Sequence, residues 1–479
     1  MAASYENQLS DWVNKEKVGV NLLNSVGTLM YDKGVELILF RRHLLEIGVS
    51  ELMHFIAYAN KVVERENNVE TANLLASEML TMNLAPSKID IGRLTAEYIE
   101  SGAKDPNPFL SEKLSHIIGV DTSSKHAKDV ILYGFGRIGR LAARELIKQA
   151  GKGQQLRLKA IVVRGLTDAQ IVKRADLLRT DSVHGAFKGV VDIDLASQSM
   201  IVNGQRIKFI DGGNPEDIDY TQYGINDALL IDNTGAFTTK EKLSRHLKAK
   251  GVSKVLLTAP GSEIPNIVYG VNSQNLDIET NDIFSAASCT TNCIVPILHL
   301  VENKYGVEKG HVETVHSYTN DQNLLDNMHR SPRRGRSAAI NMVITSTGAG
   351  KAVTKVIPSL EGKLTANAVR VPTPNVSLAI LKLTLNKSTS VKDINATMRD
   401  AALHGNLINQ INYQVEPDLV STDIVGNTCC AVYDSTATIC TTDGKDVVLY
   451  VWYDNEFGYT KQVIRLAKQI AKVRRLTYY

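Results

Sequence analysis

A short apolar segment followed by three spaced glycines constrains the fold of this chain more than any other feature. Residues 130–133 (Val-Ile-Leu-Tyr) have the character of a buried strand and lead directly into Gly134, Gly136 and Gly139. An amphipathic helical pattern follows, and a second apolar segment, Leu158–Val163, comes about 20 residues later. This order of strand, turn, helix and strand predicts the start of a parallel sheet with crossover helices.

Each of the three glycines has its own physical role in such a turn. Gly134 allows the tight turn, Gly136 lets the backbone approach a pyrophosphate, and Gly139 permits close packing of helix on strand. The N-terminus of the following helix attracts the anion. We therefore expect a dinucleotide cofactor at this turn.

The remainder of the chain continues with short strand-like segments. They are residues 228–231, 255–258, 311–316, 369–385 and 447–453. Together they predict a mixed α+β region in the second half of the chain. The last segment, Thr460–Leu476, is predicted to be a helix, and we expect its final charges, Lys472, Arg474 and Arg475, to complement the helix C-terminus and face water.

The first 125 residues differ in character from the rest. They read as amphipathic helices, for example over Val69–Leu80, and carry 12 Lys and Arg against 17 Asp and Glu. Prolines at 106 and 108 and the polar run 121–126 indicate a linker. We predict three parts: a helical extension with its linker at 1–126, a cofactor-binding domain at 127–288 completed by a C-terminal helix at 454–479, and a catalytic domain at 289–453.

Composition excludes several classes of protein. The net charge of +3 is too small to indicate a nucleic-acid or membrane partner, and no apolar stretch reaches the roughly 18 residues of a membrane span. The five cysteines are odd in number and lack the spacing of a zinc site. The first twenty residues lack the apolar core of a secretory signal. We expect a cytoplasmic protein with no metal ion.

A single cysteine is the strongest local signal for chemistry. Cys289 stands between Ser288 and Thr290, just before an apolar run of helical character. A thiol at a helix N-terminus has a lowered pKa, and the N–H groups there can hold an oxyanion. Such a nucleophile needs a base, for which His316 is a candidate. From spacing alone, both residues could instead have a purely structural role: Cys289 as a small buried apolar residue and His316 as an ordinary strand residue.

From about Lys128 onward the chain resembles phosphorylating glyceraldehyde-3-phosphate dehydrogenase. The resemblance is carried by the runs 134–140, 288–293, 316–322, 333–336, 346–349, 370–375 and 452–456. It implies an α/β fold, with a Rossmann-type doubly wound dinucleotide-binding domain and an α+β catalytic domain, here preceded by an all-α extension. It also implies a homotetramer with the 317–340 loop near a subunit interface.

The resemblance implies a reaction through a cysteine thioester. Cys289 would attack the aldehyde of glyceraldehyde 3-phosphate, with His316 as its base. Hydride transfer to NAD or NADP would leave a thioester that inorganic phosphate cleaves to 1,3-bisphosphoglycerate, reversibly, in glycolysis or gluconeogenesis. By the same resemblance the cofactor would be bound by Gly134, Gly136, Arg137, Ile138, Gly139, Thr234, Thr258 and Asn455. The substrate phosphate would be bound by Thr319, Asp321 and Arg370, the attacking phosphate by Ser288, Thr290, Thr347 and Gly348, and Arg334 matches a further phosphate-binding arginine.

Three departures from the family pattern lie on the adenine-ribose side of the cofactor. Gly165, after Arg164, stands where NAD-specific members have Asp; Asn327–Met328 replaces Leu–Pro; and residues 213–216 read Gly-Asn-Pro-Glu instead of Arg-Asp-Pro-Glu. Without the carboxylate a 2′-phosphate is not repelled, and Arg164 could pair with it. These residues favour use of NADP. The alternatives are an Arg164 that faces solvent and an Asp168, three residues after Gly165, that partly substitutes for the missing carboxylate.

Two further functions and the role of the extension stay open at this point. Erythrose-4-phosphate dehydrogenase shares the nucleophile, but the intact run 318–321 (Tyr-Thr-Asn-Asp) favours the triose phosphate. A catalytically silent regulatory protein on the same scaffold is disfavoured because Cys289, His316, Arg334 and Arg370 are all present. The extension, which ordinary family members lack, could stabilise the tetramer, regulate activity or recruit an unknown partner.

Overall fold

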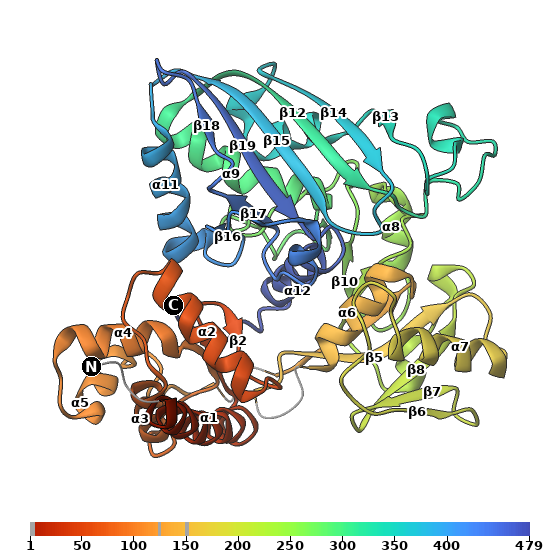
Figure 1. Cartoon of the computed structure of the whole chain (residues 1–479). Helices are drawn as coiled ribbons and strands as arrows, with labels where there is room; N and C mark the ends of the chain where they lie inside the picture. The colour runs from red at the N-terminus through yellow and green to blue at the C-terminus, as the bar shows by residue number, and fades with distance from the viewer. Residues whose placement is uncertain (1–4, 123–125, 149–152) are drawn as a thin grey trace. The chain divides into compact units, whose positions relative to one another are not determined.

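The computed structural model describes residues 5–122, 126–148 and 153–479, which form two compact units (Figure 1). The larger unit contains residues 128–148 and 156–472. The smaller one combines residues 1–127 with 149–155 and 473–479, so both ends of the chain belong to it. None of the helices in these described ranges combines the length and the apolar character needed to cross a membrane.

The first half of the larger unit is built on an eight-stranded sheet with the order β11-β10-β9-β4-β5-β8-β7-β6. Its strands are β4 (Lys128–Tyr133), β5 (Leu156–Val163), β6 (Val191–Asp194), β7 (Ser199–Val202), β8 (Gln205–Asp211), β9 (Ala228–Asp232), β10 (Val252–Leu257) and β11 (Ile283–Ser285). Its helices are α6 (Arg137–Ile147), α7 (Asp168–Arg179) and α8 (Lys240–Leu247), with 3-10 turns at Pro215–Asp217 and Tyr220–Tyr223. Strands β8, β5, β4, β9, β10 and β11 run parallel, which confirms the predicted dinucleotide-binding fold.

The second half contains a mixed sheet of eight strands. Seven follow the order β13-β14-β12-β15-β19-β17-β16, and β18 pairs with β19. The strands are β12 (Val307–Ser317), β13 (Val343–Thr345), β14 (Leu364–Val371), β15 (Ser377–Leu385), β16 (Ile411–Gln414), β17 (Ala431–Asp434), β18 (Ile439–Cys440) and β19 (Asp446–Tyr453). The helices are α9 (Cys289–Tyr305), α10 (Ala349–Val356), α11 (Val391–Leu403) and α12 (Phe457–Ile470), with 3-10 turns at Pro332–Gly335, Pro358–Leu360, Gly405–Leu407 and Ser421–Ile424.

One face of this sheet forms the core against α9. Residues along β19 alternate between buried and half-buried, as expected for a sheet that is covered on one side. Ile294, Ile297 and Leu298 of α9 lie in one apolar cluster with Leu381 of β15 and Leu449 of β19. This packing fixes the position at which α9 begins, and Cys289 is its first residue.

The smaller unit is mostly helical, but it is not all-α as we expected. Its elements are α1 (Tyr5–Lys33), β1 (Val35–Leu39), β2 (Arg42–His43), α2 (Val49–Val62), α3 (Val69–Met79), β3 (Ser87–Asp90), α4 (Ile91–Ser101), α5 (Pro106–Lys113) and β20 (Leu476–Tyr478). The four strands form a sheet in the order β2-β1-β3-β20. The strand β1 is a short apolar run after Gly34, too brief for periodicity to distinguish it from the surrounding helices.

The predicted C-terminal helix is also shorter than expected. Helix α12 ends at Ile470, and residues 476–478 form β20, which pairs in parallel with β3 of the smaller unit. Arg475 does not face water: its side chain is buried, and its Nη1 lies 3.2 Å from Oε2 of Glu36 on β1. The last residues of the chain therefore form a strand and do not continue the helix α12.

Glu36 is the centre of this buried ion cluster. Its Oε1 lies 2.7 Å from Nδ1 of His43 and 3.4 Å from Nζ of Lys88. Burial opposes ionisation of the carboxyl, but Lys88, His43 and Arg475 together hold its pKa well below the usual range. The cluster therefore joins β20, at the C-terminus, to strands from the N-terminal part of the chain.

We expect Arg475→Leu to weaken the sheet of the smaller unit by about 2 kcal/mol, because it leaves a buried carboxylate with fewer cations. Since folding lowers the pKa of Glu36, this stabilisation is present above the pKa of an unfolded glutamate and is lost as the pH falls through the folded value. Hydrogen exchange of the β3 amides measures the opening free energy. The control is Arg65→Leu, at an exposed pair with Glu100; equal effects of the two variants would contradict the expectation.

Candidate active site

Cys289 stands at the N-terminus of the helix α9. The residue before it, Ser288, caps the helix by accepting the Thr291 N–H at 3.0 Å. Ala287 has a φ of +55°, and this turn in the backbone leads from β11 into the helix. Because the first N–H groups of a helix have no partner within it, the Cys289 sulfur lies where an oxyanion can be bound.

His316 lies next to this sulfur, although it is on a different element. It is close to the end of β12, and its Nε2 lies 3.7 Å from Sγ of Cys289. Its Nδ1 donates to the Ser317 carbonyl at 2.7 Å, which leaves Nε2 of the neutral ring unprotonated and facing the thiol. The structure therefore brings together the two residues that spacing alone did not connect.

The titration behaviour of the pair follows from burial and from nearby arginines. Burial raises the pKa of the Cys289 thiol, while Arg370 and the Thr290 N–H oppose that effect. Burial, together with the charges of Arg370 and Arg334, lowers the pKa of His316 to about 3. Both shifts favour the neutral thiol and the neutral imidazole, so the case for His316 as the proton acceptor rests on the position of its Nε2 beside the sulfur.

The two arginines create a site for anions beside this pair. Arg370 on β14 is in register with His316 on β12, and its Nη1 donates to the Ser317 carbonyl at 3.0 Å. Nη1 also lies 3.5 Å from Oγ1 of Thr319. The buried Nε of Arg370 has no hydrogen-bond partner within the described ranges of the chain. A donor of this kind next to a thiol fits a phosphate group.

Arg334 connects the other predicted phosphate residues. Its Nη1 donates to Asp321 at 2.6 Å, and its Nε donates to Thr345 Oγ1 at 3.0 Å. Its Nη2 reaches the Ser346 carbonyl at 3.4 Å, directly before Thr347 and Gly348. Gly348 is the N-cap of α10, so the backbone N–H groups that follow it begin a helix near Arg334.

Two predicted hydroxyl ligands have partners within the protein. The Thr290 hydroxyl lies 3.0 Å from the hydroxyl of Tyr453, and the Ser288 hydroxyl lies 2.7 Å from that of Thr291. The structure thus places both residues beside Cys289 but engages their side chains in local hydrogen bonds. Their hydroxyls keep acceptor or donor capacity for an anion.

The glycine turn has the geometry expected for dinucleotide binding. Gly134 has a φ of +96°, and a Cβ on Gly139 would come within 2.5 Å of the Gly134 carbonyl oxygen. A Cβ on Gly136 would meet no atom within 4 Å, so this part of the turn is open. Gly136 caps α6, whose first residues are Arg137 and the half-buried Ile138. An open backbone at a helix N-terminus fits the pyrophosphate of a dinucleotide.

Arg137 uses its side chain within the protein. Its Nη2 lies 2.6 Å from Oε2 of Glu456 and 3.1 Å from Oδ1 of Asp181. The hydrogen bond to Glu456 raises the pKa of the Arg137 guanidinium. Burial opposes ionisation of Asp181, but the N–H groups of His184 and Val183, together with Arg137, lower the pKa of its carboxyl to about 2. Two carboxylates therefore hold the guanidinium of Arg137, and we expect its backbone, at the start of α6, to border a pyrophosphate.

Thr234 and Thr258 both donate hydrogen bonds to Asp232, which is the last residue of β9. The carboxylate of Asp232 accepts the Thr234 N–H at 2.8 Å and its hydroxyl at 2.7 Å, and the Thr258 hydroxyl donates to the Asp232 carbonyl at 3.0 Å. Its other carboxylate oxygen lies 3.1 Å from Nε2 of His246, and both side chains are fully buried. This histidine–aspartate pair holds the loop at Thr234.

The amide of Asn455 is oriented by two serines. Its Oδ1 accepts hydrogen bonds from Ser317 at 2.9 Å and from Ser377 at 3.0 Å. These bonds leave the amide nitrogen as the donor that Asn455 can offer to a ligand. Ser317 is adjacent to His316, so Asn455 lies in the same region of the larger unit as the thiol.

Comparison with known proteins identifies the family. The model of the glyceraldehyde 3-phosphate dehydrogenase NAD binding domain matches residues 128–240, and that of the C-terminal domain matches residues 288–455. The chain belongs to the glyceraldehyde-3-phosphate dehydrogenase family. It is therefore an oxidoreductase that uses NAD(P) and acts on a small molecule.

The relatives of this dehydrogenase differ in how much of the chain they cover. A glyceraldehyde-3-phosphate dehydrogenase-like protein of Pseudomonas aeruginosa (strain UCBPP-PA14) is 47% identical over 454 residues, 94% of this chain and 98% of its own length. A glyceraldehyde-3-phosphate dehydrogenase of Clostridium pasteurianum is 41% identical over 349 residues, which cover 72% of this chain and 98% of the relative. Glyceraldehyde-3-phosphate dehydrogenase 1 of Bacillus subtilis (strain 168) is 40% identical over 347 residues, which cover 72% of this chain and 99% of the relative. Only the first of these three is long enough to match most of the extension.

The end of β5, where Arg164 and Gly165 lie, has charged residues of both signs near it. Arg164 is exposed, and Arg174 on α7 donates to its carbonyl at 2.8 Å and to that of Gly165 at 3.0 Å. The Gly165 N–H donates to Oδ1 of Asp211 at 3.0 Å. Neither Arg174 nor Asp211 was predicted, because they reach this point from α7 and from the end of the adjacent strand β8.

His246 gives a test of how the cofactor loop is held. We expect His246→Leu to weaken binding of NAD(P)+ about fivefold while kcat changes less than threefold, because Asp232 loses its buried partner and releases Thr234. Calorimetric titration with the cofactor gives the affinity. His246→Gln, which can still donate to Asp232, should recover part of it. His404→Leu, at an exposed pair with Asp400, is the control and should bind the cofactor as the wild type does. If His246→Leu also binds it with unchanged affinity, His246 does not have this role.

Proposed function

We propose that this protein is a phosphorylating glyceraldehyde-3-phosphate dehydrogenase, which converts glyceraldehyde 3-phosphate, NAD(P)+ and inorganic phosphate reversibly to 1,3-bisphosphoglycerate. The observation that carries the proposal is the 3.7 Å approach of Cys289 Sγ to His316 Nε2 at the start of a helix. The cation at Arg370, with its unpartnered Nε, lies beside that pair and suits a phosphorylated aldehyde.

The proposed reaction begins with attack of the Cys289 sulfur on the aldehyde carbon. His316 Nε2 accepts the thiol proton as the carbon–sulfur bond forms, and the resulting imidazolium donates a hydrogen bond to the new oxyanion. The oxyanion takes up that proton, and the neutral ring then accepts it again as hydride leaves the same carbon. NAD(P)+ bound at the glycine turn would supply the hydride acceptor. Inorganic phosphate then attacks the thioester carbonyl, and Cys289 leaves as the thiolate.

Two anion positions support the phosphorylating reaction. Arg370 and Thr319 would hold the phosphate of the substrate, with Asp321 orienting Arg334. Arg334 and the start of α10 after Gly348 would hold the attacking phosphate, beside the hydroxyl groups of Ser288 and Thr290. Burial and the charge of Arg334 lower the pKa of Arg370, so the site favours an anion that compensates both cations.

We also propose that the enzyme accepts NADP. The exposed Arg164 and the nearby Arg174 can compensate the charge of a 2′-phosphate at the end of β5, where Gly165 replaces a carboxylate. The carboxylate of Asp211 on β8 acts in the opposite direction, since it repels a phosphate and can accept from a ribose hydroxyl. Asp168, the first residue of α7, is a second carboxylate near this strand end, so the proposal depends on the exposed Arg164 pairing with the 2′-phosphate and not on a count of charges.

A homotetramer in the cytoplasm completes the proposal. The segment after β12 exposes a group of large apolar side chains: Leu324, Leu325, Met328, Ile340, Met342 and Ile344. Met328 is 94% exposed, and an apolar group of this size is typical of a surface that a partner covers. The segment overlaps the loop that the family resemblance places at a subunit interface.

We expect Cys289→Ser to lower kcat at least a thousandfold, because a serine hydroxyl is a far weaker nucleophile at neutral pH. The assay follows formation of the reduced cofactor with glyceraldehyde 3-phosphate and phosphate, and with erythrose 4-phosphate as the competing substrate. Cys293→Ser is the matched control, since this buried thiol contacts the Val451 carbonyl and not the pair. Equal loss in both variants would contradict a nucleophilic role for Cys289.

The cofactor proposal predicts that Arg164→Ala lowers kcat/KM for NADP about tenfold and leaves that for NAD within twofold. Asp211→Asn should raise kcat/KM for NADP, because it removes the opposing charge. Steady-state kinetics with both cofactors measures the ratio. Lys188→Ala removes an exposed cation elsewhere in the same domain as a control. A wild-type preference for NAD that persists unchanged in Arg164→Ala would refute NADP use through this residue.

A further inference from the structure

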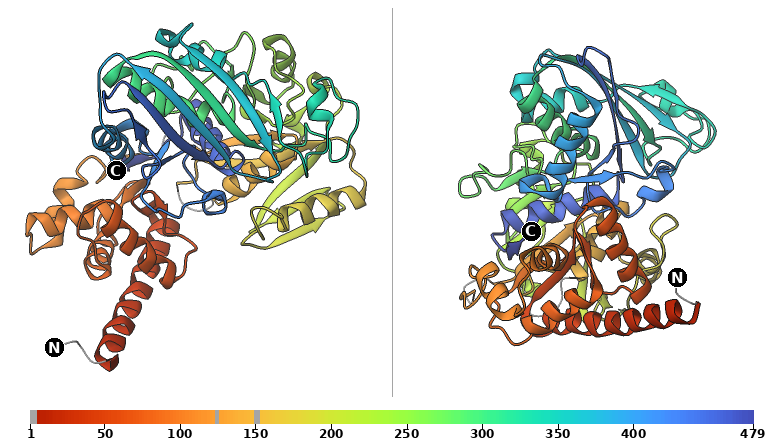
Figure 2. Two further views of the ribbon diagram at one scale, coloured as in Figure 1. Left: turned by 45° about the horizontal axis from the view of Figure 1, so that its top comes forward. Right: turned by 60° about the vertical axis from the view of Figure 1, so that its left-hand side comes forward.

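The first half of helix α1 is mostly exposed, and only a few of its side chains, such as Trp12 and Lys15, lie near other elements in the described part of the chain. Residues 5–15 are exposed on every side of the helix, and the buried positions begin only at Gly19 and continue to Met30. Figure 2 shows this half projecting from the other elements of the smaller unit. A helix of about four turns without a packed face is only marginally stable in water, because most helical stability comes from tertiary contacts.

The projecting half nevertheless carries an apolar stripe. At roughly 100° per residue, Tyr5, Leu9, Trp12, Val13 and Val20 fall within about 100° of one another around the helix. Their exposed fractions are 73%, 44%, 46%, 38% and 56%. One polar residue, Glu16, lies within the same sector, and its Oε1 accepts a hydrogen bond from the Trp12 indole at 3.0 Å. A stripe of this width is the pattern of a helix that packs on another surface.

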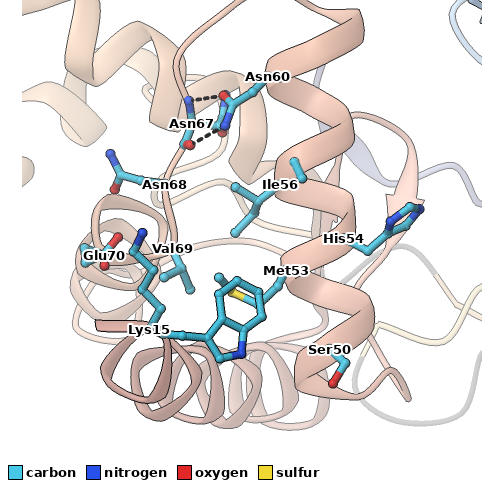
Figure 3. Close-up of a pocket in the computed structure, with 12 residues that line it drawn as sticks. Lys15, Ser50, Met53, His54, Ile56, Asn60, Asn67, Asn68, Val69 and Glu70 are labelled. Carbon is cyan, nitrogen blue, oxygen red and sulfur yellow. Dashed lines mark hydrogen bonds between the residues drawn. The ribbon is translucent and has the colours of Figure 1, made fainter. Parts of the chain in front are cut away.

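A hollow lies beside this stripe (Figure 3). It has a volume of about 370 Å³ and an apolar floor that includes Met53 and Ile56 of α2 and Val69 of α3, while Trp12 and Lys15 of α1 form its edge. The indole of Trp12 therefore borders both the hollow and the stripe. A partner that covers the stripe near Trp12 can also contact the apolar side chains that line the hollow.

The charges that flank the stripe identify the partner as a second copy of this helix. Glu6 and Lys17 lie on the same flank and are placed symmetrically about the middle of the segment 5–18. An antiparallel copy brings Glu6 of each helix opposite Lys17 of the other. A parallel copy places this flank against the opposite flank, which carries Gln8 and Lys15, so that it forms no Glu6–Lys17 pair and brings Lys17 near Lys15. In the antiparallel register Leu9 and Trp12 of one helix fall between apolar positions of the other.

We propose that the projecting half of α1 pairs in antiparallel fashion with the same segment of a second copy, through the apolar stripe and two Glu6–Lys17 ion pairs. The interface is isologous, since a two-fold axis between residues 11 and 12 exchanges the two helices. It involves only the extension and does not depend on the proposed dehydrogenase activity. It gives the extension a partner, namely another molecule of the same protein.

Cysteine cross-linking of the full-length protein tests the register. Trp12→Cys and Val13→Cys lie next to the two-fold axis, so mild oxidation should join two chains in each variant above the wild-type background. Val20→Cys is the matched control, because antiparallel pairing separates the two copies of residue 20 by about 25 Å along the axis. Cross-linking of all three variants would indicate parallel pairing and overturn the proposal, as would cross-linking of none.

Charge exchange tests the same interface without cysteines. We expect Lys17→Glu to weaken association about tenfold in analytical ultracentrifugation, with dehydrogenase activity unchanged. The double variant Glu6→Lys/Lys17→Glu should restore association. Lys104→Glu, at an exposed position of the same unit, is the control. If Lys17→Glu associates as the wild type does, the stripe is covered by something other than a second α1, and the proposal is wrong.

Discussion

The catalysis that we propose depends on the contact between the start of one helix and the end of one strand. The sulfur of Cys289 and the imidazole of His316 come within 3.7 Å because α9 begins where β12 ends. The apolar face of α9 packs on β15 and β19 in a single buried cluster, so neither element can shift alone. A core of ordinary aliphatic residues thus holds two reactive groups within proton-transfer distance.

The charges around that pair have opposite effects on its two members. Arg370 stabilises a thiolate at Cys289 and destabilises an imidazolium at His316, because both side chains lie within its field. In the proposed reaction, a phosphate bound at Arg370 would compensate that field and so raise the pKa of His316. The ring would then be better able to hold the thiol proton with substrate bound than without it.

The sequence carries local signals for the candidate reactive residues, but none for the residues that hold them in place. Gly134, Gly136 and Cys289 carry local signals, since a turn and a helix start are determined by adjacent residues. The partners Arg137 and Glu456 lie 319 positions apart, and His246 on the helix α8 reaches Asp232 at the end of the strand β9. No local pattern connects such pairs. The strands of the extension were missed for a related reason: they are too short for a period of two to be visible.

The extension is not a simple N-terminal addition, because the chain returns to it. After α12 the last residues form β20 on the sheet of the smaller unit, and Arg475 joins the buried cluster at Glu36. Deleting residues 1–125 would therefore also strip β20 of its neighbour β3 and leave Arg475 without its carboxylate. A loss of activity in such a deletion would not separate regulation from the loss of a C-terminal anchor. Point variants on the exposed half of α1 leave that sheet intact, and they are the sharper way to determine what the extension does.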